Sequence, residues 1–257
     1  MAEILLETRD LNRFFGGLRA VADVSLRAMR GQIKAVIGPN GAGKTTLFNL
    51  ISGNLRPQSG SVRFRGQEIT RLKPYMIARR GIFRTFQTTR LFAHMSVLEN
   101  VMVGRHTCSR AGFLACMLNV PWKWPEERAI RGKAMETLRS LGLEGYAEET
   151  AQNLPFGRQR MVEFARALAT EPQLLLLDEP AAGLNVHETA ELSDLLLAIR
   201  DRGITLLVVE HDMSLVMDIS DEIVVLDRGS VIAEGKPEDI QRDERVVRIY
   251  LGEERAE

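Results

Sequence analysis

The sequence predicts an α/β fold with a mixed, largely parallel sheet, an antiparallel β subdomain and an inserted helical subdomain. Residues 174–177 and 204–209 are apolar runs separated by a helical pattern, and strands that are apolar on both faces are typical of a parallel sheet covered by helices. Residues 3–31 instead alternate apolar and polar positions in short pieces, which is typical of antiparallel strands. Over about 74–170 the pattern becomes helical, which indicates the inserted subdomain.

The composition is that of an ordinary globular protein. At 257 residues the chain suits one large domain or two small ones, and 45% of its residues are apolar and 26% charged. Lys plus Arg and Asp plus Glu both total 34, so the overall charge favours neither a nucleic acid nor an acidic membrane surface as a partner. The apolar runs are far shorter than the ~18 residues that a membrane span needs, so any work at a membrane is expected to go through a partner.

The first strands are expected within residues 3–31, and the same alternation returns at 62–66. These segments are expected to pack beside the strand that precedes the glycine-rich loop described next. Phe14 and Phe15 stand just before two glycines and are expected in a loop between strands. One of them could stack on a nucleotide base, and packing in the core is the alternative.

A glycine-rich loop follows the apolar run at 33–37, which indicates a buried strand. The loop fits G-x-x-x-x-G-K-[ST] at every fixed position, and apolar residues then resume at a helical spacing over 47–51. The expected nucleotide contacts are Gly38, Pro39, Asn40, Gly41, Ala42, Gly43, Lys44, Thr45 and Thr46. A glycine-rich turn that merely matches the pattern is the alternative, and the strand before it and the helix after it argue against that alternative. The loop therefore predicts a nucleotide phosphate site.

The residue types explain how such a loop binds phosphate. Glycines carry no Cβ, so the loop can turn tightly and bring backbone N–H groups against phosphate oxygens. The helix that follows begins at the phosphates, where its unpaired N–H groups and the positive end of its dipole favour an anion. Lys44 adds a full charge at the β- and γ-phosphates, and the Thr45 hydroxyl is the expected Mg²⁺ ligand.

Two carboxylates follow the leucine run at 174–177. Asp178 comes at the carboxyl end of this expected strand, where ligands bind in open α/β sheets, and there it can hold Mg²⁺, usually through a water. Glu179 is one residue further, where it can polarise an attacking water as a general base. A core strand that ends in a solvated Asp-Glu pair is the alternative, which a phosphate loop in the same chain disfavours.

The remaining elements follow from terminal and periodic signals. Helices are expected to begin at Pro74 and Pro125, because proline suits the first turn of a helix. A helix is expected over 188–202, a hairpin over 223–233, and one or two short helices over 237–252.

The phosphate loop and the two carboxylates together resemble the ATP-binding cassette family, and the other motifs of that family have matches here. Gln87, in RTFQ, matches the Q-loop glutamine, which the resemblance places near the Mg²⁺ and the nucleophile and at the link to a transmembrane partner. His211, in VVEHD, matches the switch histidine at the γ-phosphate, and Phe15 matches the aromatic residue that stacks on adenine. The resemblance implies ATP as the nucleotide, and Mg²⁺ held by Thr45, Gln87 and Asp178.

The family signature, usually Leu-Ser-Gly-Gly-Gln, corresponds here to Leu154, Pro155, Phe156, Gly157 and Arg158 and differs at three places. The resemblance implies that it caps the γ-phosphate of ATP held by the opposite subunit. Pro155 has neither a side-chain hydroxyl nor a backbone N–H, whereas the N–H groups of the following helix remain and Arg158 adds a charge. We expect an intact but weakened half-site.

Asn185, in PAAGLN, replaces the usual aspartate of the family's D-loop and keeps its hydrogen-bonding shape but not its charge. Because this departure and Pro155 both belong to the subunit interface, we expect pairing with a second, different ATPase subunit, with a homodimer as the alternative. The resemblance covers essentially the whole chain. It implies one ATPase domain over 1–257, in which an inserted helical subdomain at about 88–168 contains the signature and 236–257 form a C-terminal helical tail.

Several stretches are similar to ATPase subunits of high-affinity importers for branched-chain amino acids, among them LPFG, PAAGLN and the ending RVVRIYLGE. The resemblance implies an ATP-hydrolysing subunit that powers import at the cytoplasmic face of the inner membrane. Its implied partners are two permease subunits and, indirectly, a periplasmic binding protein, but no nucleic acid. A related urea or amide importer is the nearest alternative, and a soluble cassette ATPase acting on ribosomes or DNA is the alternative from a different class.

Four arginines precede or follow the Q-loop glutamine: Arg79, Arg80, Arg84 and Arg90. On the resemblance, we expect them in the groove that receives a short helix of the permease. A solvated basic face is the alternative interpretation.

Overall fold

The computed structural model describes residues 3–85, 91–106 and 123–253, and the chain divides into two compact units. The core unit comprises Met1–Gln87 and Gln173–Glu257, and the helical unit comprises Thr88–Pro172. Each unit has a buried apolar cluster of its own. Within the described ranges, no helix is both long enough and apolar enough to cross a membrane.

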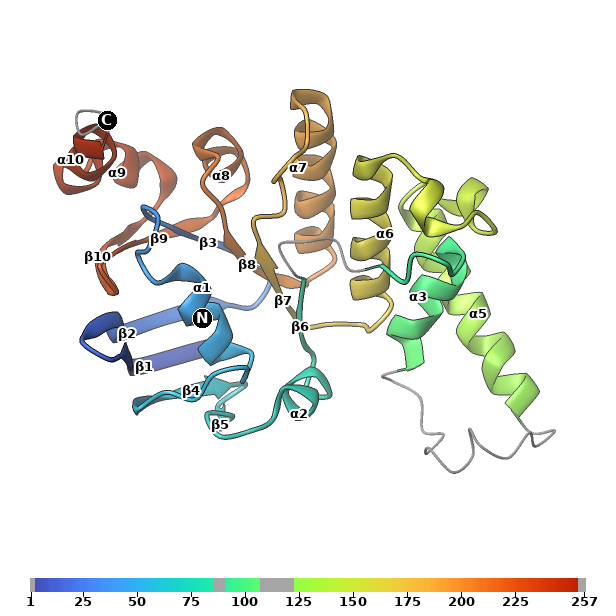
Figure 1. The fold of residues 1–257 in the computed structure, drawn as a ribbon, viewed down its shortest axis with the longest axis horizontal. Coiled ribbons are helices and arrows are strands. Elements are labelled where there is room, and N and C mark those ends of the chain that lie inside the picture. Colours follow the sequence, from blue (N-terminus) through green and yellow to red (C-terminus); the bar gives the residue numbers. More distant parts are fainter. Residues whose placement is uncertain (1–2, 86–90, 107–122, 254–257) are drawn as a thin grey trace. The chain divides into compact units, whose positions relative to one another are not determined.

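The core unit contains a six-stranded sheet (Figure 1). In spatial order its strands are β10 (Ser230–Gly235), β9 (Glu222–Asp227), β3 (Ile33–Ile37), β8 (Thr205–Val209), β7 (Leu174–Asp178) and β6 (Ile82–Arg84). Neighbouring strands run parallel except in the β9–β10 hairpin. Strands β3, β7 and β8 are buried along their whole length, which explains their nearly continuous apolar sequences. The mixed, largely parallel sheet confirms the predicted fold class.

A second, antiparallel sheet is formed by the N-terminal part of the chain. Its order is β2 (Leu18–Met29), β1 (Ile4–Phe15), β4 (Ser59–Phe64) and β5 (Gln67–Glu68). These strands form a separate sheet, although their inner faces share one apolar cluster with the six-stranded sheet. Phe14 and Phe15 are the last residues of β1, so the prediction that placed them in a loop is wrong.

The helices of the core unit are α1 (Lys44–Ile51), α2 (Pro74–Ala78), α7 (Val186–Asp201), α8 (Met213–Ile219), α9 (Pro237–Arg242) and α10 (Glu244–Glu253). Alternate side chains of β3 face different clusters, as a strand period of two requires. Val36 packs in the cluster that contains α1 and the antiparallel sheet, whereas Ala35 and Ile37 pack with residues of α8, α9 and α10. Helix α7, the β9–β10 hairpin and the two C-terminal helices all agree with the sequence-based expectation.

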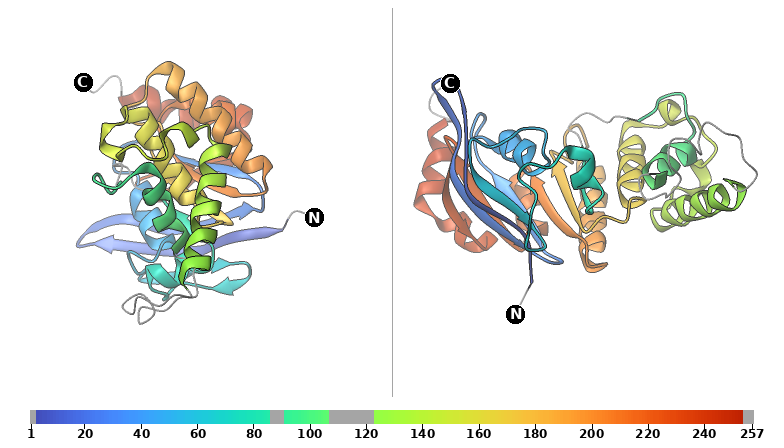
Figure 2. Two further views of the ribbon diagram at one scale, coloured as in Figure 1. Left: turned by 90° about the vertical axis from the view of Figure 1, so that its right-hand side faces the viewer. Right: turned by 90° about the horizontal axis from the view of Figure 1, so that it is seen from below.

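The helical unit is built from α3 (Val97–His106), α5 (Lys123–Ser140) and α6 (Phe156–Leu168), with 3-10 turns at Glu144–Tyr146 and Ala151–Asn153. The three helices contact one another pairwise (Figure 2). Gly104 on α3 lies so close to α6 that a Cβ there would be 2.2 Å from the carbonyl oxygen of Arg166, so only glycine fits. Helix α5 begins at Lys123 and not, as predicted, at Pro125.

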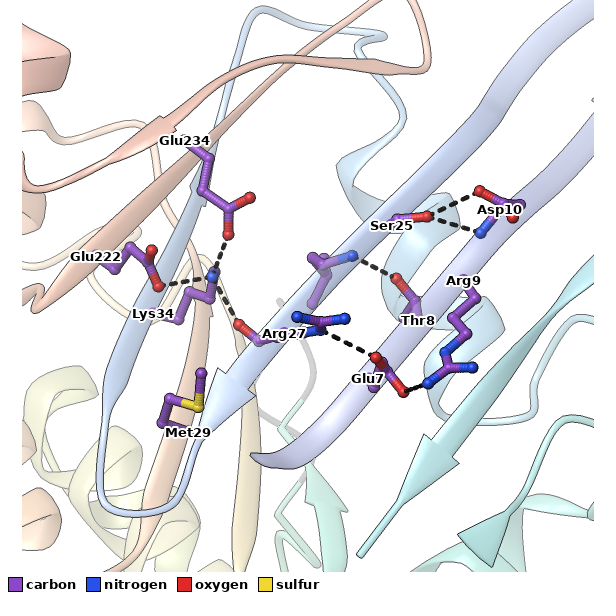
Figure 3. Close-up of a pocket in the computed structure, with 11 residues that line it drawn as sticks. Glu7, Thr8, Arg9, Asp10, Ser25, Arg27, Met29, Lys34, Glu222 and Glu234 are labelled. Carbon is purple, nitrogen blue, oxygen red and sulfur yellow. Dashed lines mark hydrogen bonds and ion pairs between the residues drawn. The ribbon is translucent and has the colours of Figure 1, made fainter. Parts of the chain in front are cut away.

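A buried lysine joins β3 to three other strands of the core unit, at the end of β3 away from the glycine-rich loop (Figure 3). Lys34 is 1% exposed, and its Nζ donates to the carbonyl oxygen of Arg27 at 2.6 Å and to Glu222 Oε2 at 2.8 Å. It also donates to Glu234 Oε1. The three hydrogen bonds satisfy all three donors of an ammonium group, which makes its burial tolerable.

The polar pocket beside Lys34 has a volume of about 500 Å³ and contains a second charged group, around Glu7 (Figure 3). Arg9 Nη2 lies 2.8 Å and Arg27 Nε 2.9 Å from the Glu7 carboxylate. The hydrogen bond from Arg9 is the main cause that lowers the pKa of Glu7, and Arg27 adds to it against the opposing effect of burial. Glu7 therefore stays ionised under physiological conditions.

Candidate functional site

The glycine-rich loop connects β3 to α1, and its backbone requires glycine at two positions. Gly38 has φ of +146° and a Cβ there would lie 2.0 Å from the carbonyl oxygen of Leu226. Gly43 has φ of +104° and a Cβ there would lie 2.1 Å from the carbonyl oxygen of Ala20. Because Gly43 directly precedes α1, the loop delivers the chain to the helix N-terminus, where the first N–H groups have no partner within the helix.

Lys44 is the first residue of α1, and its side chain extends back along the loop. Its Nζ donates to the carbonyl oxygens of Gly38 at 2.5 Å and Pro39 at 2.9 Å. The ammonium group and the open helix N-terminus therefore lie at the same loop. Thr45 is exposed beside it, and Thr46 is half-buried. This arrangement combines positive charge with backbone donors, as an anion site does.

The turn of the β9–β10 hairpin is hydrogen-bonded to the glycine-rich loop, a contact that the sequence did not predict. The N–H of Gly229 donates to the carbonyl oxygen of Ala42 at 3.0 Å, and the N–H of Ala22 donates to the carbonyl oxygen of Gly229 at 2.7 Å. The turn thus connects the glycine-rich loop to β2. No local signal could have identified this contact, because Ala42 and Gly229 are remote in the sequence.

Two carboxylates lie at the end of β7. The parallel register pairs Val36 of β3 with Val209 of β8, and Val209 with Asp178 of β7, so the three strands end at one edge of the sheet. The side chain of Asp178 is 5% exposed, whereas that of Glu179 is 24% exposed. Glu179 has φ of +48°, a left-handed conformation unusual for a residue with a Cβ, and its N–H donates to the carbonyl oxygen of Val209 at 2.9 Å.

Arg84, at the end of β6, holds the Asp178 carboxylate. Its Nη2 lies 2.7 Å from Asp178 Oδ2, while its Nη1 donates to Asn49 Oδ1 at 2.7 Å and to Ser52 Oγ at 3.3 Å. Asn49 belongs to α1 and Ser52 follows it, so one guanidinium joins the helix after the glycine-rich loop to the end of β7. The sequence analysis expected Arg84 in a permease groove or on a solvated face. Its side chain is instead 10% exposed and pairs with Asp178 inside the core unit, so both expectations are wrong for this residue.

His211 follows β8 by two residues and stands beside Glu179. Its Nδ1 lies 4.0 Å from Glu179 Oε1, and its side chain is 64% exposed. The imidazole and the Glu179 carboxylate thus lie close together, and both side chains are accessible to solvent. The structure therefore places the two residues on adjacent loops at the same edge of the sheet.

Phe15 lies at the tip of the β1–β2 hairpin, and its side chain is exposed. The guanidinium of Arg13 lies over its ring, 4.8 Å from the ring centroid. The arginine covers one face of the ring by a cation–π contact, and a base can stack only on a face that stays open. Arg13 also donates to the carbonyl oxygen of Arg56 at 3.2 Å, which fixes its position.

The residues that correspond to the signature lie at the start of α6 in the helical unit. Helix α6 begins at Phe156, so Pro155 occupies the cap position of this helix. Phe156 is 48% exposed, whereas Leu154 is buried. Gly157 is half-buried in the first turn. The Arg158 guanidinium lies 5.7 Å from the centroid of the Tyr146 ring.

Asn185 caps helix α7. Its Oδ1 accepts a hydrogen bond from the N–H of Glu188 at 3.0 Å, and the Glu188 carboxylate accepts from the N–H of Asn185 at 3.0 Å. This reciprocal arrangement is a capping box, in which aspartate serves as well as asparagine. The departure at Asn185 therefore leaves the local fold intact and changes only the charge.

Comparison with known proteins assigns the chain to a family. Residues 21–182 match the family described as ABC transporter. The chain belongs to the ABC transporter family. Residues 230–256 of this ABC chain also match a shorter family, described as branched-chain amino acid ATP-binding cassette transporter. The latter match covers β10, α9 and α10.

Individual relatives cover nearly the full length of the chain. The high-affinity branched-chain amino acid transport ATP-binding protein BraF of Pseudomonas aeruginosa is 43% identical over 98% of this chain and 100% of its own. The ADP conformation of MJ1267, an ATP-binding cassette of an ABC transporter, has a TM-score of 0.85 at 34% identity, over 97% of this chain and 99% of that one. The dimeric post-hydrolysis state of the ATP-binding cassette MJ0796, bound to ADP and Pi, has a TM-score of 0.75 at 25% identity, over 91% and 99% of the two chains.

The structure brings some of the predicted site residues of this ABC chain together and separates others. The glycine-rich loop, Asp178, Glu179 and His211 lie at one edge of the core-unit sheet. Phe15 belongs to the antiparallel sheet of the same unit, and the signature belongs to the helical unit. Gln87 and Arg90 lie outside the described residues.

Proposed function

We propose that this chain is the ATP-binding and ATP-hydrolysing subunit of an ABC importer for branched-chain amino acids. The observation that supports this function is the meeting of the phosphate loop, Asp178, Glu179 and His211 where β3, β7 and β8 end. The substrate class rests on the name of BraF, the 43% identical branched-chain amino acid transport protein, and on the match at residues 230–256.

The donor set fits a nucleotide with a divalent cation. Lys44 and the N-terminus of α1 would hold the β- and γ-phosphates, and the Phe15 ring would stack on adenine. The Thr45 hydroxyl and an Asp178 carboxylate oxygen are hard oxygen ligands of the kind that Mg²⁺ prefers, and Gln87 would be a third ligand. When bound, the ion neutralises charge on the phosphates.

The protein side of hydrolysis would be performed by Glu179 and His211. The Glu179 carboxylate orients an attacking water and accepts its proton, and its partial exposure leaves space for that water. His211, whose Nδ1 lies 4.0 Å from Glu179 Oε1, reaches toward the γ-phosphate and stabilises the charge that develops there. The ion pair with Arg84 keeps Asp178 fixed while the nucleotide binds.

The signature would act on the ATP of a second subunit in a head-to-tail dimer. The dimeric state of MJ0796 supports a pair of cassettes as the working unit. Pro155 and Asn185 favour a paralogous ATPase as the second member. Two permease subunits and, through them, a periplasmic binding protein complete the importer, with this chain at the cytoplasmic face of the inner membrane.

The first test asks which proteins accompany the tagged full chain when it is extracted gently from native membranes. Recovery with a second cassette ATPase and two membrane proteins is expected. The accompanying binding protein, titrated with leucine, isoleucine, valine and urea, then identifies the substrate. Recovery with ribosomes or DNA would contradict the transport function.

The second test asks whether Glu179 is the base. The change Glu179→Gln should leave ATP binding within about twofold and lower hydrolysis at least ~100-fold, as expected for loss of a general base. Lys44→Ala is the matched variant that should lose ATP binding itself. Normal hydrolysis by Glu179→Gln would require a different base.

A further inference from the structure

A second buried carboxylate lies between the two loops that hold Glu179 and His211. Glu210 directly follows β8 and is 1% exposed. Its Oε1 accepts a hydrogen bond from the N–H of Ala181 at 2.8 Å. Its Oε2 accepts from the N–H of His211 at 3.0 Å and from that of Asp212 at 3.4 Å.

The two carboxylate oxygens serve different loops. Ala181 belongs to the turn after Glu179, which leads to the cap of α7. His211 and Asp212 belong to the loop that leads to the cap of α8. One rigid, planar group therefore fixes the distance between the loop of the candidate base and the loop of the candidate switch histidine.

Burial of a charge is costly unless strong hydrogen bonds compensate it. Hydrogen bonds from neutral donors to an ionised carboxylate are shorter and stronger than bonds between neutral groups, so a glutamate can hold both loops firmly where an amide could not. An amide has one acceptor oxygen, and its NH₂ group would face the remaining N–H donors. The choice of glutamate at this position is thus explained by the need to accept on both sides.

We propose that Glu210 is a positioning residue that couples the loop after Glu179 to the loop of His211, so that the two move as one when ATP binds. This inference rests on the proposed function, because it takes Glu179 and His211 as the residues that act on ATP. It predicts that turnover, and not ATP affinity, depends on the carboxylate. In the proposed function the main contacts with ATP come from the phosphate loop, whereas among the described residues the hydrogen bonds to the Glu210 carboxylate come from Ala181, His211 and Asp212.

The test compares two substitutions of a carboxylate by an amide in the full chain. Glu210→Gln keeps the shape but can serve only one loop, and we expect kcat for ATP hydrolysis to fall about tenfold with the Kd for ATP unchanged within about twofold. The control is Asp212→Asn. Asp212 accepts from Ser214 and Leu215 with the single atom Oδ1, so an asparagine can keep both bonds and should stay within about twofold of the wild type.

A double-mutant cycle separates coupling from a general loss of stability. If Glu210 acts through His211, the double variant Glu210→Gln/His211→Ala should be no slower than His211→Ala alone, within about twofold. If the fold-losses in kcat of the two single variants multiply in the double variant, the coupling is overturned. Hydrogen exchange at the amides of Ala181 and His211 gives an activity-independent measurement. Both should be protected in the wild type, and in Glu210→Gln the amide of the loop that loses its acceptor should exchange faster.

The outcomes distinguish this inference from the proposed function. If the wild type hydrolyses ATP, His211→Ala slows it and Glu210→Gln does not, the inference is wrong and the proposed function stands. If the wild type binds no ATP, the proposed function fails, and with it the coupling role. If Glu210→Gln does not fold, unequal protection of the Ala181 and His211 amides in the wild type would overturn the inference, and equal protection would support it.

Discussion

At the scale of single residues, Arg84 is the side chain on which the geometry of the site depends most. Its side chain is 10% exposed, and its guanidinium contacts Asp178, Asn49 and Ser52. Breaking a buried ion pair by removing one partner is far more destabilising than the net strength of the pair suggests, because it leaves the other charge buried alone.

We therefore expect Arg84→Met to lower the free energy of unfolding by about 3 to 5 kcal/mol. The side chains of Arg84 and Asp178 are 10% and 5% exposed, so solvent screens the pair little. Urea unfolding of the full chain measures the effect. Arg79→Met, at an exposed position of the same region, is the control and should change stability by less than about 0.5 kcal/mol. Equal effects of the two changes would show that the ion pair is unimportant.

At the scale of elements, the starts of helices α6 and α7 differ in how they are capped. Helix α7 has the reciprocal capping box of Asn185 and Glu188. Helix α6 has Pro155 at its cap and no side-chain hydrogen bond there. The helix that bears the signature thus keeps its N-terminal N–H groups open, and the helix that follows the D-loop does not.

At α7, Asn185→Ala should lower the free energy of unfolding by about 1 kcal/mol, the usual cost of losing an N-cap side chain. Asn185→Asp is the control and should be nearly neutral, because its carboxylate accepts the same hydrogen bond. Urea unfolding and hydrogen exchange in the first turn of α7 measure both. A destabilised Asn185→Asp would contradict the assignment of this residue as a cap.

At α6, Pro155→Ser should stabilise the helix by about 0.5 to 1 kcal/mol, because serine supplies the missing cap acceptor. Restoring the hydroxyl should also strengthen the signature half-site and raise the ATP affinity of the assembled complex. Pro155→Ala, which adds an N–H but no hydroxyl, is the matched control. Unchanged nucleotide affinity and turnover in Pro155→Ser would contradict the weakened half-site.

The elements that bind phosphate could be predicted because their signals are local. The strand at 33–37, the loop and the helix are consecutive, and Asp178 and Glu179 directly follow a run of leucines. The ion pair of Arg84 and Asp178 joins residues 94 apart, and the Glu210–Ala181 bond joins residues 29 apart. Neither separation is fixed by a helical or strand period, so no pattern in one sequence could reveal these contacts.

At the scale of the whole molecule, the chain offers a core unit with the phosphate loop and a helical unit with the signature. In the proposed head-to-tail pair, each ATP would need both units, contributed by different subunits. In that proposed pair, the departures from the family pattern at Pro155 and Asn185 would weaken only the contributions that this chain makes to its partner.

We therefore expect the full chain with Glu179→Gln to remain monomeric with ATP when alone and to form a one-to-one complex when its paralogous ATPase is present. Light scattering of the purified proteins measures both. The double variant Lys44→Ala/Glu179→Gln, which should not bind ATP, is the control. A stable ATP-dependent homodimer would contradict asymmetric pairing.

Lys34 has a consequence for how the sheet assembles. Strands β3, β7 and β8 are short, apolar on both faces and alike in composition, so hydrophobic burial alone distinguishes poorly between neighbours or between registers. A single ammonium within β3 changes this, because only one alignment offers it the carboxylates of Glu222 and Glu234, 188 and 200 residues away. A slip by one residue would leave that charge among leucines and valines. The buried lysine is thus expected to favour the native register of β3 over a slipped one, and it lies near the end of the strand opposite to the glycine-rich loop.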